Sequence, residues 1–393
     1  MDPNVIQDWL SLLFRWAHIV AGIGWIGSSF YFMWLDSSLK RRAGMPETIK
    51  GDNWTVHGGG FYHTQKYLVA PEAMPGDLHW FRWESYFTWL TGFALMAVTY
   101  YWSASLYLID PGVADLAPWQ AIGLSVVGLV AGWVLYDQLC KSPLRAQPTV
   151  MFGVLFGVLV LATWGYGQVF SARAAFIQVG ATIATFMTGN VFLVIIPNQR
   201  IVVADLKAGR VPDAKYGQIA KLRSTHNNYL TLPVLFLMIS NHYPMTFGHS
   251  HAWAIVGLVL LIGVVVRHWF NLHEAGIGGR QIAWQWPAAA ALVAALVVLT
   301  AWRPGGAEVE VPDDATAMAL IQTHCTSCHA ARPSHEAFDA PPGDVALETP
   351  EAVRRVAPKV LAQAVMTKAM PLGNETEMTD AERAVLGAWL RGE

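Results

Sequence analysis

The sequence contains few charged residues and almost no cysteine. Only 14% of its 393 residues are charged, whereas 54% are hydrophobic and 18 are tryptophan. In a soluble globular protein about a quarter of the residues are charged, so this composition indicates a membrane protein. The net charge is -2 and the basic residues collect in a few connecting segments, which argues against nucleic acid as a partner.

Three cysteines cannot build a disulfide framework. Cys140 stands alone at the end of an apolar run, where we expect a buried small hydrophobic residue rather than a redox group. The other two, Cys325 and Cys328, belong to a motif near the C-terminus.

Eight apolar stretches are long enough to cross a hydrocarbon layer of about 30 Å, which takes about 20 residues. Several contain Gly or Pro, which a membrane helix tolerates when neighbouring helices satisfy the freed backbone groups. We therefore predict an all-α bundle of eight transmembrane helices. Asp2 and Asp8 precede the first stretch, unlike the start of a secretory signal, so we expect this helix to be retained. The expected spans are 9–35, 83–108, 118–139, 148–170, 174–197, 226–243, 251–272 and 282–302.

Lysine and arginine are unevenly distributed among the connecting loops. The loops after the second, fourth and sixth spans contain only Arg173. Because cytoplasmic loops carry the excess of positive charge, we expect the odd-numbered loops in the cytoplasm and both chain ends outside. The odd-numbered loops contain Lys40, Arg41, Arg42, Lys50, Lys66, Arg82, Lys141, Arg145, Arg200, Lys207, Arg210, Lys215, Lys221, Arg223 and Arg280.

The composition changes abruptly after the last span. A linker rich in Pro and Gly, 304–312, leads into a charged segment without further spans. The last helix of this segment opens with Thr379 and Glu382, which have the spacing of a capping box. We therefore predict a membrane domain over 1–303 and a small helical domain, like a class I cytochrome c, over 313–393.

This second domain contains the sequence Cys325-Thr-Ser-Cys328-His329. The spacing lets two thiols on one helical turn add to the two vinyl groups of haem, while the adjacent histidine ligates the iron. A zinc site would require a second Cys or His pair, and a thioredoxin-like dithiol a βαβ setting; neither is visible. We predict one covalent haem c, bound through Cys325 and Cys328, with His329 as an axial ligand.

The second axial ligand is expected downstream, and Met370, followed at once by Pro371, is the best candidate. A thioether raises the potential of haem iron, which suits an electron acceptor. Met366 lies inside a helical pattern, where we expect core, and Met378 lies beside the capping box. Haem c is attached on the outer side of bacterial membranes. The motif therefore predicts an inner-membrane protein with a periplasmic N-terminus and C-terminal domain.

Polar residues inside membrane spans are costly and are candidates for function, although helix packing also uses them. On the first span His18 shares a face with Gly22 and Trp25, which could hold a haem edge or pack against a helix. On the fifth span a polar stripe can form a packing seam or a cavity wall, and we favour the seam. The stripe consists of Gln178, Thr182, Thr185 and Gly189.

The first cytoplasmic loop, 36–82, combines three consecutive glycines with His57, His63 and Lys66. Glycines let backbone N–H groups approach a ligand closely, and these side chains could hold an anionic heterocycle. Glycines and aromatic residues also serve simply to fold a loop onto a bundle. His57 and His63, with His226 near the inner end of the sixth span, are the candidate catalytic residues.

The segment Arg15–Phe32 (RWAHIVAGIGWIGSSFYF), the His-Gly-Gly-Gly-Phe-Tyr loop, the eight spans and the C-terminal haem motif form a familiar order. The sequence resembles the membrane-bound urate oxidases fused to cytochrome c, also called urate hydroxylases, over essentially its whole length. The resemblance implies that urate and water become 5-hydroxyisourate without formation of hydrogen peroxide. It also implies that electrons leave through haem c to a soluble cytochrome or a terminal oxidase.

The implied activity raises a problem of distance. If urate binds at the cytoplasmic loops and haem c lies outside, a bilayer of about 30 Å separates them. Either the urate site lies toward the outer half, or a second redox centre lies between. We predict a haem b in the membrane domain with His18 as one ligand.

Two other functions fit the same layout. The chain could be a cytochrome-linked dehydrogenase of another small molecule, such as a quinol. It could also be a non-catalytic electron-transfer subunit or a transporter, and such a protein would show no turnover with an artificial acceptor.

Overall fold

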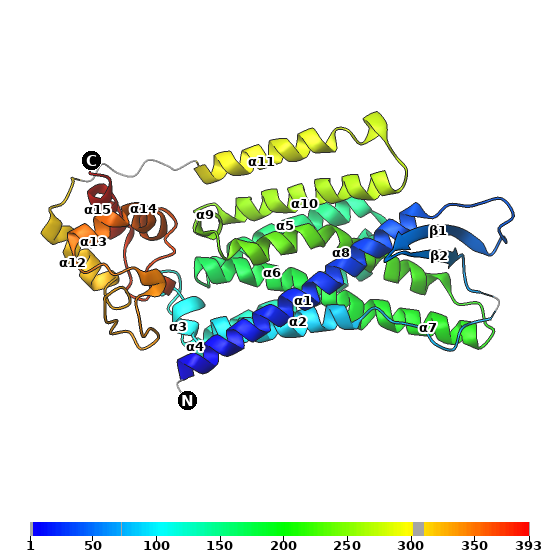
Figure 1. The fold of residues 1–393 in the computed structure, drawn as a ribbon, viewed down its shortest axis with the longest axis horizontal. Helices are drawn as coiled ribbons and strands as arrows, with labels where there is room; N and C mark the ends of the chain where they lie inside the picture. The colour runs from blue at the N-terminus through cyan, green and yellow to red at the C-terminus, as the bar shows by residue number, and fades with distance from the viewer. Residues whose placement is uncertain (1–2, 72, 302–309, 393) are drawn as a thin grey trace.

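Long helices lie side by side along one axis and form an elongated bundle (Figure 1). The computed structural model describes residues 3–71, 73–301 and 310–392, so most of the expected linker lies outside the described residues. The bundle helices are α1 (Pro3–Ser38), α2 (Trp83–Met96), α4 (Pro118–Lys141), α5 (Pro148–Tyr166), α6 (Ala172–Gly189), α7 (Ile196–Lys207), α8 (Ala214–Ser240), α10 (Ala252–Glu274) and α11 (Gln285–Ala301).

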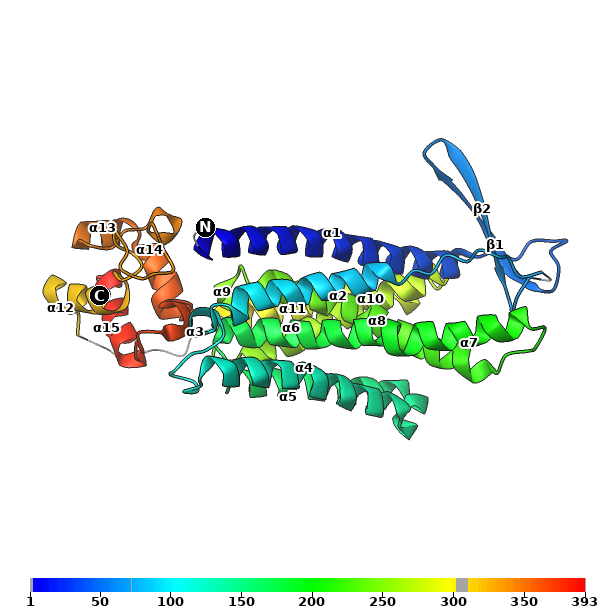
Figure 2. The same ribbon diagram turned by 90° about the horizontal axis from the view of Figure 1, so that it is seen from below.

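A compact helical C-terminal domain lies at one end of the bundle, next to the start of α1 (Figure 2). We call this the domain end, and the opposite end the hairpin end. The short helices α3 (Ala104–Tyr107) and α9 (Pro244–Phe247) lie at the domain end. The C-terminal domain contains α12 (Asp314–His324), α13 (Pro350–Arg355), α14 (Ala357–Val360) and α15 (Asp380–Arg391).

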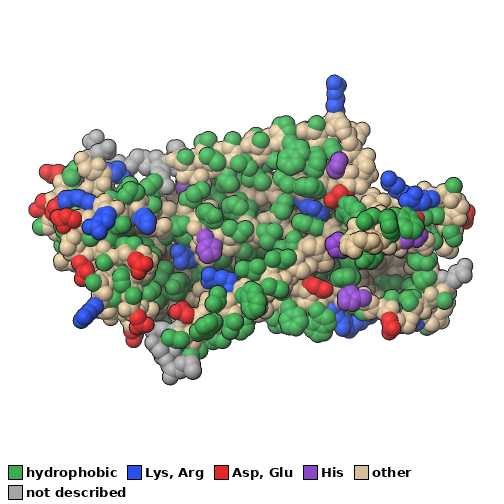
Figure 3. All heavy atoms as spheres, in the orientation of Figure 1, with side chains coloured by type: hydrophobic (Ala, Val, Ile, Leu, Met, Phe, Trp, Pro, Cys, Tyr) green, Lys and Arg blue, Asp and Glu red, His purple; other side chains and the backbone are tan. Residues whose placement is uncertain are grey.

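Within the described residues, 6 helical segments are long and apolar enough to cross a membrane. Figure 3 shows hydrophobic side chains over the middle of the bundle, with charged ones gathered on the C-terminal domain and near the hairpin end. Two of the eight expected spans do not meet these limits. α2 continues into the π-helical segment Ala97–Tyr101 but contains Glu84 and several polar residues, and α8 carries Lys221, Arg223, His226, Asn227 and Asn228. The count of eight is therefore not confirmed, although both helices pack within the bundle.

The expectation of an all-α fold was wrong for the first loop, which forms an antiparallel hairpin of β1 (Ile49–His57) and β2 (Gly60–Tyr67). Gly58 and Gly59 occupy the turn with φ of 60° and 79°. A two-residue hairpin turn of this kind needs positive φ at both central positions. The turn alone thus accounts for these two glycines.

The most buried span runs through α6 and α7 without a break and reaches Lys207, ten residues past the expected end at 197. A π-helical segment, Asn190–Ile195, lies directly before Pro197. Proline removes one backbone hydrogen bond, and a local π-turn is a common way to accommodate the missing donor. The proline therefore shifts the helix without ending it.

The polar stripe of α6 is a packing seam, as predicted. The Gln178 Nε2 donates to the Ser125 carbonyl oxygen at 2.7 Å, and the Ser125 hydroxyl donates to Gln178 Oε1 at 2.7 Å. The Trp89 Nε1 donates to Thr185 Oγ1 at 3.0 Å. These bonds join α6 to α4 and α2 and leave the central helix with its polar groups satisfied.

The C-terminal domain contacts the bundle through the loop that follows Met370. Gly373 has φ of 61°, and a Cβ at this position would lie 2.5 Å from the Leu106 carbonyl oxygen. Asn374, the next residue, hydrogen-bonds to Asp110 of the bundle. The loop thus rests directly on the backbone around α3.

We predict that Gly373→Ala destabilises the protein more than Gly343→Ala. Both glycines have nearly the same positive φ, but only Gly373 meets the bundle, since nothing lies within 4 Å of a Cβ at Gly343. Each substitution costs about 1–2 kcal/mol because of the positive φ. The difference in stability between the two variants therefore measures the contact of Gly373 with the bundle. Thermal unfolding of the full chain should give a lower midpoint for Gly373→Ala. Equal midpoints would show that the contact does not contribute to stability.

Candidate functional site

The haem motif lies where α12 ends, and its histidine is oriented for ligation. The His329 Nδ1–H donates to the Val345 carbonyl oxygen at 2.8 Å, which leaves Nε2 as the atom with a free lone pair. Cys325 and Met370 pack against the same hydrophobic core of the domain. The predicted donor set for haem c is therefore assembled within one small domain, and the residues fit the group.

The two motif thiols do not have the character of a reactive dithiol. Burial raises the pKa of Cys325 to about 11, and burial also raises the pKa of Cys328. Reactive dithiol pairs instead have a lowered pKa, because the thiolate is the nucleophile.

The loop carrying Met370 is fixed by Arg383, a side chain only 4% exposed. Its guanidinium donates to the Met370 carbonyl oxygen at 2.5 Å, to Asn374 Oδ1 at 2.9 Å and to the Ala364 carbonyl oxygen. A single planar cation thus joins two points of the loop to the π-helical segment Leu361–Met366. Because Asn374 also contacts the bundle, the position of Met370 is tied to the contact between the domains.

The two weaker methionine candidates lie in different settings. Met378 is buried in the core of the C-terminal domain. Met366 ends the π-helical segment Leu361–Met366 and is partly exposed, so our expectation of a core position for it was wrong.

The two loop histidines lie on the hairpin. His57 is exposed at the end of β1. His63 stacks on Trp54 with ring centroids 4.2 Å apart, and its Nε2 lies 2.7 Å from Asp52 Oδ2. Burial acts to raise the pKa of Asp52, but hydrogen bonds from Arg42 and His63 outweigh it and hold this pKa below its ordinary value. His63 therefore serves the hairpin's own ion-pair network.

His18 packs against α2. Its Nδ1–H donates to the Thr88 carbonyl oxygen at 2.9 Å, and a Cβ on Gly92 would lie 2.7 Å from the His18 ring. The close helix packing expected for this face is thus present. The hydrogen bond leaves Nε2 with its lone pair, so a haem b ligand role remains a prediction.

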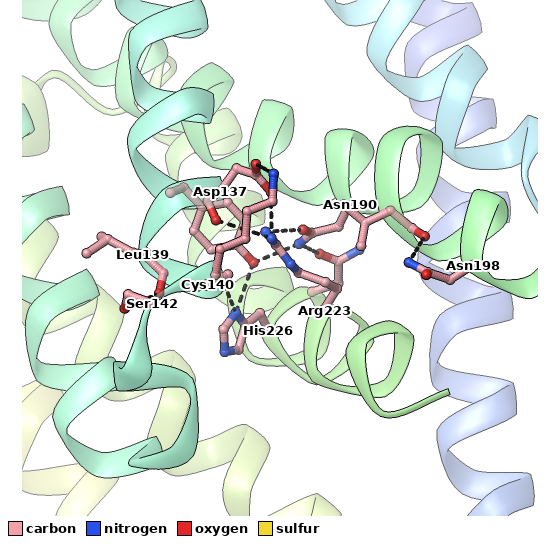
Figure 4. Close-up of polar contacts among 12 residues, drawn as sticks. Asp137, Leu139, Cys140, Ser142, Asn190, Asn198, Arg223 and His226 are labelled. Atoms are coloured by element: carbon pink, nitrogen blue, oxygen red, sulfur yellow. Dashed lines mark hydrogen bonds and ion pairs between the residues drawn. The ribbon is translucent and has the colours of Figure 1, made fainter. Parts of the chain in front are cut away.

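A buried polar network joins α4, α8 and the π-helical segment after α6 (Figure 4). Arg223, only 2% exposed, donates from Nη2 to Asp137 Oδ1 at 2.6 Å and from Nη1 to Asn190 Oδ1 at 3.2 Å. Its guanidinium also lies 5.1 Å from the Tyr136 ring centroid. This buried charge is therefore fully engaged by partners.

The third histidine candidate, His226, belongs to this network. Asn190 Nδ2 donates to the Tyr136 hydroxyl oxygen at 2.8 Å, and that hydroxyl lies 2.9 Å from His226 Nδ1. A hydroxyl that accepts from Asn190 can donate its own proton to His226 Nδ1, and in that arrangement the imidazole carries its proton on Nε2. The pair can thus pass a proton between a phenol and an imidazole.

The structure separates the histidine candidates and adds residues that sequence reasoning missed. His57 and His63 lie on the protruding hairpin, whereas His226 lies within the bundle. Arg223, expected in a cytoplasmic loop, is buried within the bundle, where it binds Asp137 of α4. The signal for Asp137 was present, since an acidic residue inside the expected span 118–139 is costly unless paired.

A cavity of about 360 Å³ lies between the bundle and the C-terminal domain. Arg173, Gln168 and Trp253 line it on the bundle side, and Lys368 and Asn374 on the other. Its volume falls in the range of small-molecule sites. It borders the loop that carries Met370.

The family model described as urate oxidase N-terminal matches residues 4–301. The chain belongs to this family. The match covers the whole bundle and ends before the C-terminal domain, so the buried network and His18 both lie within the urate oxidase family region. Neither the curated proteins nor the solved structures contain a match to this chain.

We expect Arg223→Met to destabilise the protein by up to about 3 kcal/mol, because it leaves Asp137 and Asn190 without their buried partner. Lys141 also contacts Asp137, at 2.5 Å, and moderates the loss. Thermal unfolding in detergent measures the effect. The double variant Arg223→Met/Asp137→Leu should recover part of the lost stability, because it also removes the carboxylate that Arg223→Met leaves without its arginine. If the double variant were less stable than Arg223→Met, the ion pair would not explain the cost.

We expect Arg383→Lys to loosen the Met370 ligand without removing haem c, because lysine cannot reach three acceptors at once. The sulfur-to-iron charge-transfer band of the oxidised protein should weaken and the haem potential should fall. Arg354→Lys is the matched control, since Arg354 is an exposed ion-pair residue of the same domain. An unchanged band and potential in Arg383→Lys would rule out the positioning role.

Proposed function

We propose that the protein oxidises urate with water to 5-hydroxyisourate and passes the electrons to haem c in its C-terminal domain. The observation that carries this proposal is the joining, in one chain, of a urate oxidase family region with a haem c motif. The two parts are in contact through the Met370 loop, which supports electron transfer within the molecule.

The chemistry balances without dioxygen. Urate loses two electrons, water adds at C5 of the oxidised ring, and two protons leave, which gives 5-hydroxyisourate. When bound, haem c would accept the two electrons one at a time and would pass each to the acceptor that follows it. No hydrogen peroxide forms, because oxygen takes no part in the oxidation.

The bundle must then bind an anion in a dry site and accept its protons. Among the candidate histidines His226 is the best placed to accept a proton, which it would take at Nδ1 from the Tyr136 hydroxyl while that hydroxyl takes a proton from the substrate. Asn190 fixes the direction of that hydrogen bond and so keeps the imidazole in one tautomer. We assign His226 the role of a proton acceptor on this basis.

We further propose a haem b at His18 as a relay. The uncommitted Nε2 of His18 supports this role. In the proposed orientation the protein lies in the bacterial inner membrane with the domain end periplasmic. Electrons would then leave haem c to a soluble cytochrome or a terminal oxidase.

Anaerobic addition of urate to the purified, oxidised protein should bleach the ultraviolet band of urate while the reduced haem c bands appear. Xanthine, which lacks the C8 oxygen, serves as the control and should leave the haem oxidised. If urate left the haem oxidised while dithionite reduced it, the proposed function would be wrong.

A pyridine haemochrome of the same sample should contain b-type as well as c-type haem. Finding c-type alone would remove only the relay.

A further inference from the structure

Two arginines are buried in the described part of the bundle, and they differ in their hydrogen bonds. Arg223 is engaged by Asp137 and Asn190. Arg267 on α10 is 4% exposed, yet its Nε and Nη2 have no hydrogen-bond partner within the described chain. Glu274 attracts this guanidinium electrostatically but fills neither donor. Buried donors without acceptors are costly, so these two atoms mark the position of a missing ligand.

The unpartnered atoms of Arg267 are the two donors of one guanidinium edge. The guanidinium carbon lies 4.3 Å from the Phe30 ring centroid, so an aromatic ring packs against the group. Nε and Nη2 present parallel N–H bonds, the arrangement that binds two adjacent acceptors of a planar anion. Arg267 is therefore equipped for bidentate recognition.

Two asparagine side chains contact each other next to this position, Asn271 on α10 and Asn228 on α8. Asn271, four residues after Arg267 on α10, donates from Nδ2 to Asn228 Oδ1 at 2.9 Å. The remaining atoms, Asn228 Nδ2 and Asn271 Oδ1, are buried and have no partner among the described residues. One donor and one acceptor of this amide pair therefore remain without a partner. Exchanging oxygen and nitrogen in both amides leaves the same pair.

A planar ligand that is both anionic and lactam-bearing matches these vacant groups. The urate anion has a deprotonated ring nitrogen next to a carbonyl oxygen, which suits the guanidinium edge. Its lactam groups pair an N–H with a C=O, which suits the two amides. Phe30 adds an aromatic surface for the ring.

We infer that Arg267, Asn228 and Asn271 bind the urate anion. This assignment rests on the proposed function and names its substrate site. All three residues lie in the region matched by the urate oxidase family. Phe30 lies twelve residues after His18 on α1, about 18 Å along the helix axis, so the site lies toward the hairpin end. A relay at His18 then stands between this site and the C-terminal domain.

The test compares Arg267→Met and Arg267→Lys with the control Arg210→Met in the full-length protein. Arg210 is an exposed arginine that pairs with Asp205. Anaerobic turnover of urate with an artificial acceptor gives KM and kcat. We expect KM to rise at least 100-fold in Arg267→Met and at least 10-fold in Arg267→Lys, which keeps the charge but loses the fork. Arg210→Met should match the wild type.

Thermal stability and a second variant distinguish a loss of urate binding from a loss of folding. Arg267→Met should unfold near the wild-type temperature, because Nε and Nη2 make no hydrogen bond in the described chain that the substitution could remove, unlike Arg223→Met. Asn271→Asp, which places a carboxylate beside the anion, should also raise KM. A thermal shift of the oxidised protein by urate, lost in Arg267→Met, would support binding independently of turnover.

The outcomes separate this inference from the proposed function. If the wild type turned over urate and both Arg267→Met and Asn271→Asp kept its KM, the site would be wrong and the function would stand. If urate stabilised the wild type but not Arg267→Met, without any haem reduction, the site would stand and the function would be wrong. If Arg267→Met unfolded well below the wild type, Arg267 would be structural and the inference overturned.

Discussion

Burial of positive charge inside an apolar bundle is the constraint on which this structure depends. A guanidinium in such surroundings must find acceptors, and Arg223 finds them on α4 and on the π-helical segment after α6. That pairing holds together the helices that carry Tyr136 and His226. Arg267 differs, because its Nε and Nη2 have no hydrogen-bond acceptor in the described chain. We infer that a bound anion supplies these acceptors.

The two ends of the bundle consequently have different tasks. Arg267 and its amide neighbours lie toward the hairpin end, where an anion would complete their hydrogen bonds. At the domain end the Met370 loop rests on the backbone near α3, and Arg383 fixes that loop from within the C-terminal domain. His18 lies between them on α1. In the proposed function, this arrangement would carry electrons along the bundle toward the C-terminal domain.

Local patterns predicted much of this architecture. Hydropathy located most of the bundle helices, and the polar stripe of α6 proved to be a seam. Sequence patterns failed where contacts between residues far apart in the sequence determine the structure. The glycines of the first loop belong to a hairpin turn, Pro197 does not end its helix, and Arg223 is buried although it resembled a loop cation. Which of two buried arginines lacks partners depends on three-dimensional packing, so no sequence period could reveal it.

The most direct test of this account is an electron cryomicroscopy map of the full-length protein with urate bound under anaerobic conditions. The account predicts a planar ligand against the Nε and Nη2 edge of Arg267, within reach of Asn228 and Asn271, and haem density attached to Cys325 and Cys328. Ligand density in the cavity beside Arg173, with the Arg267 edge unoccupied, would contradict it.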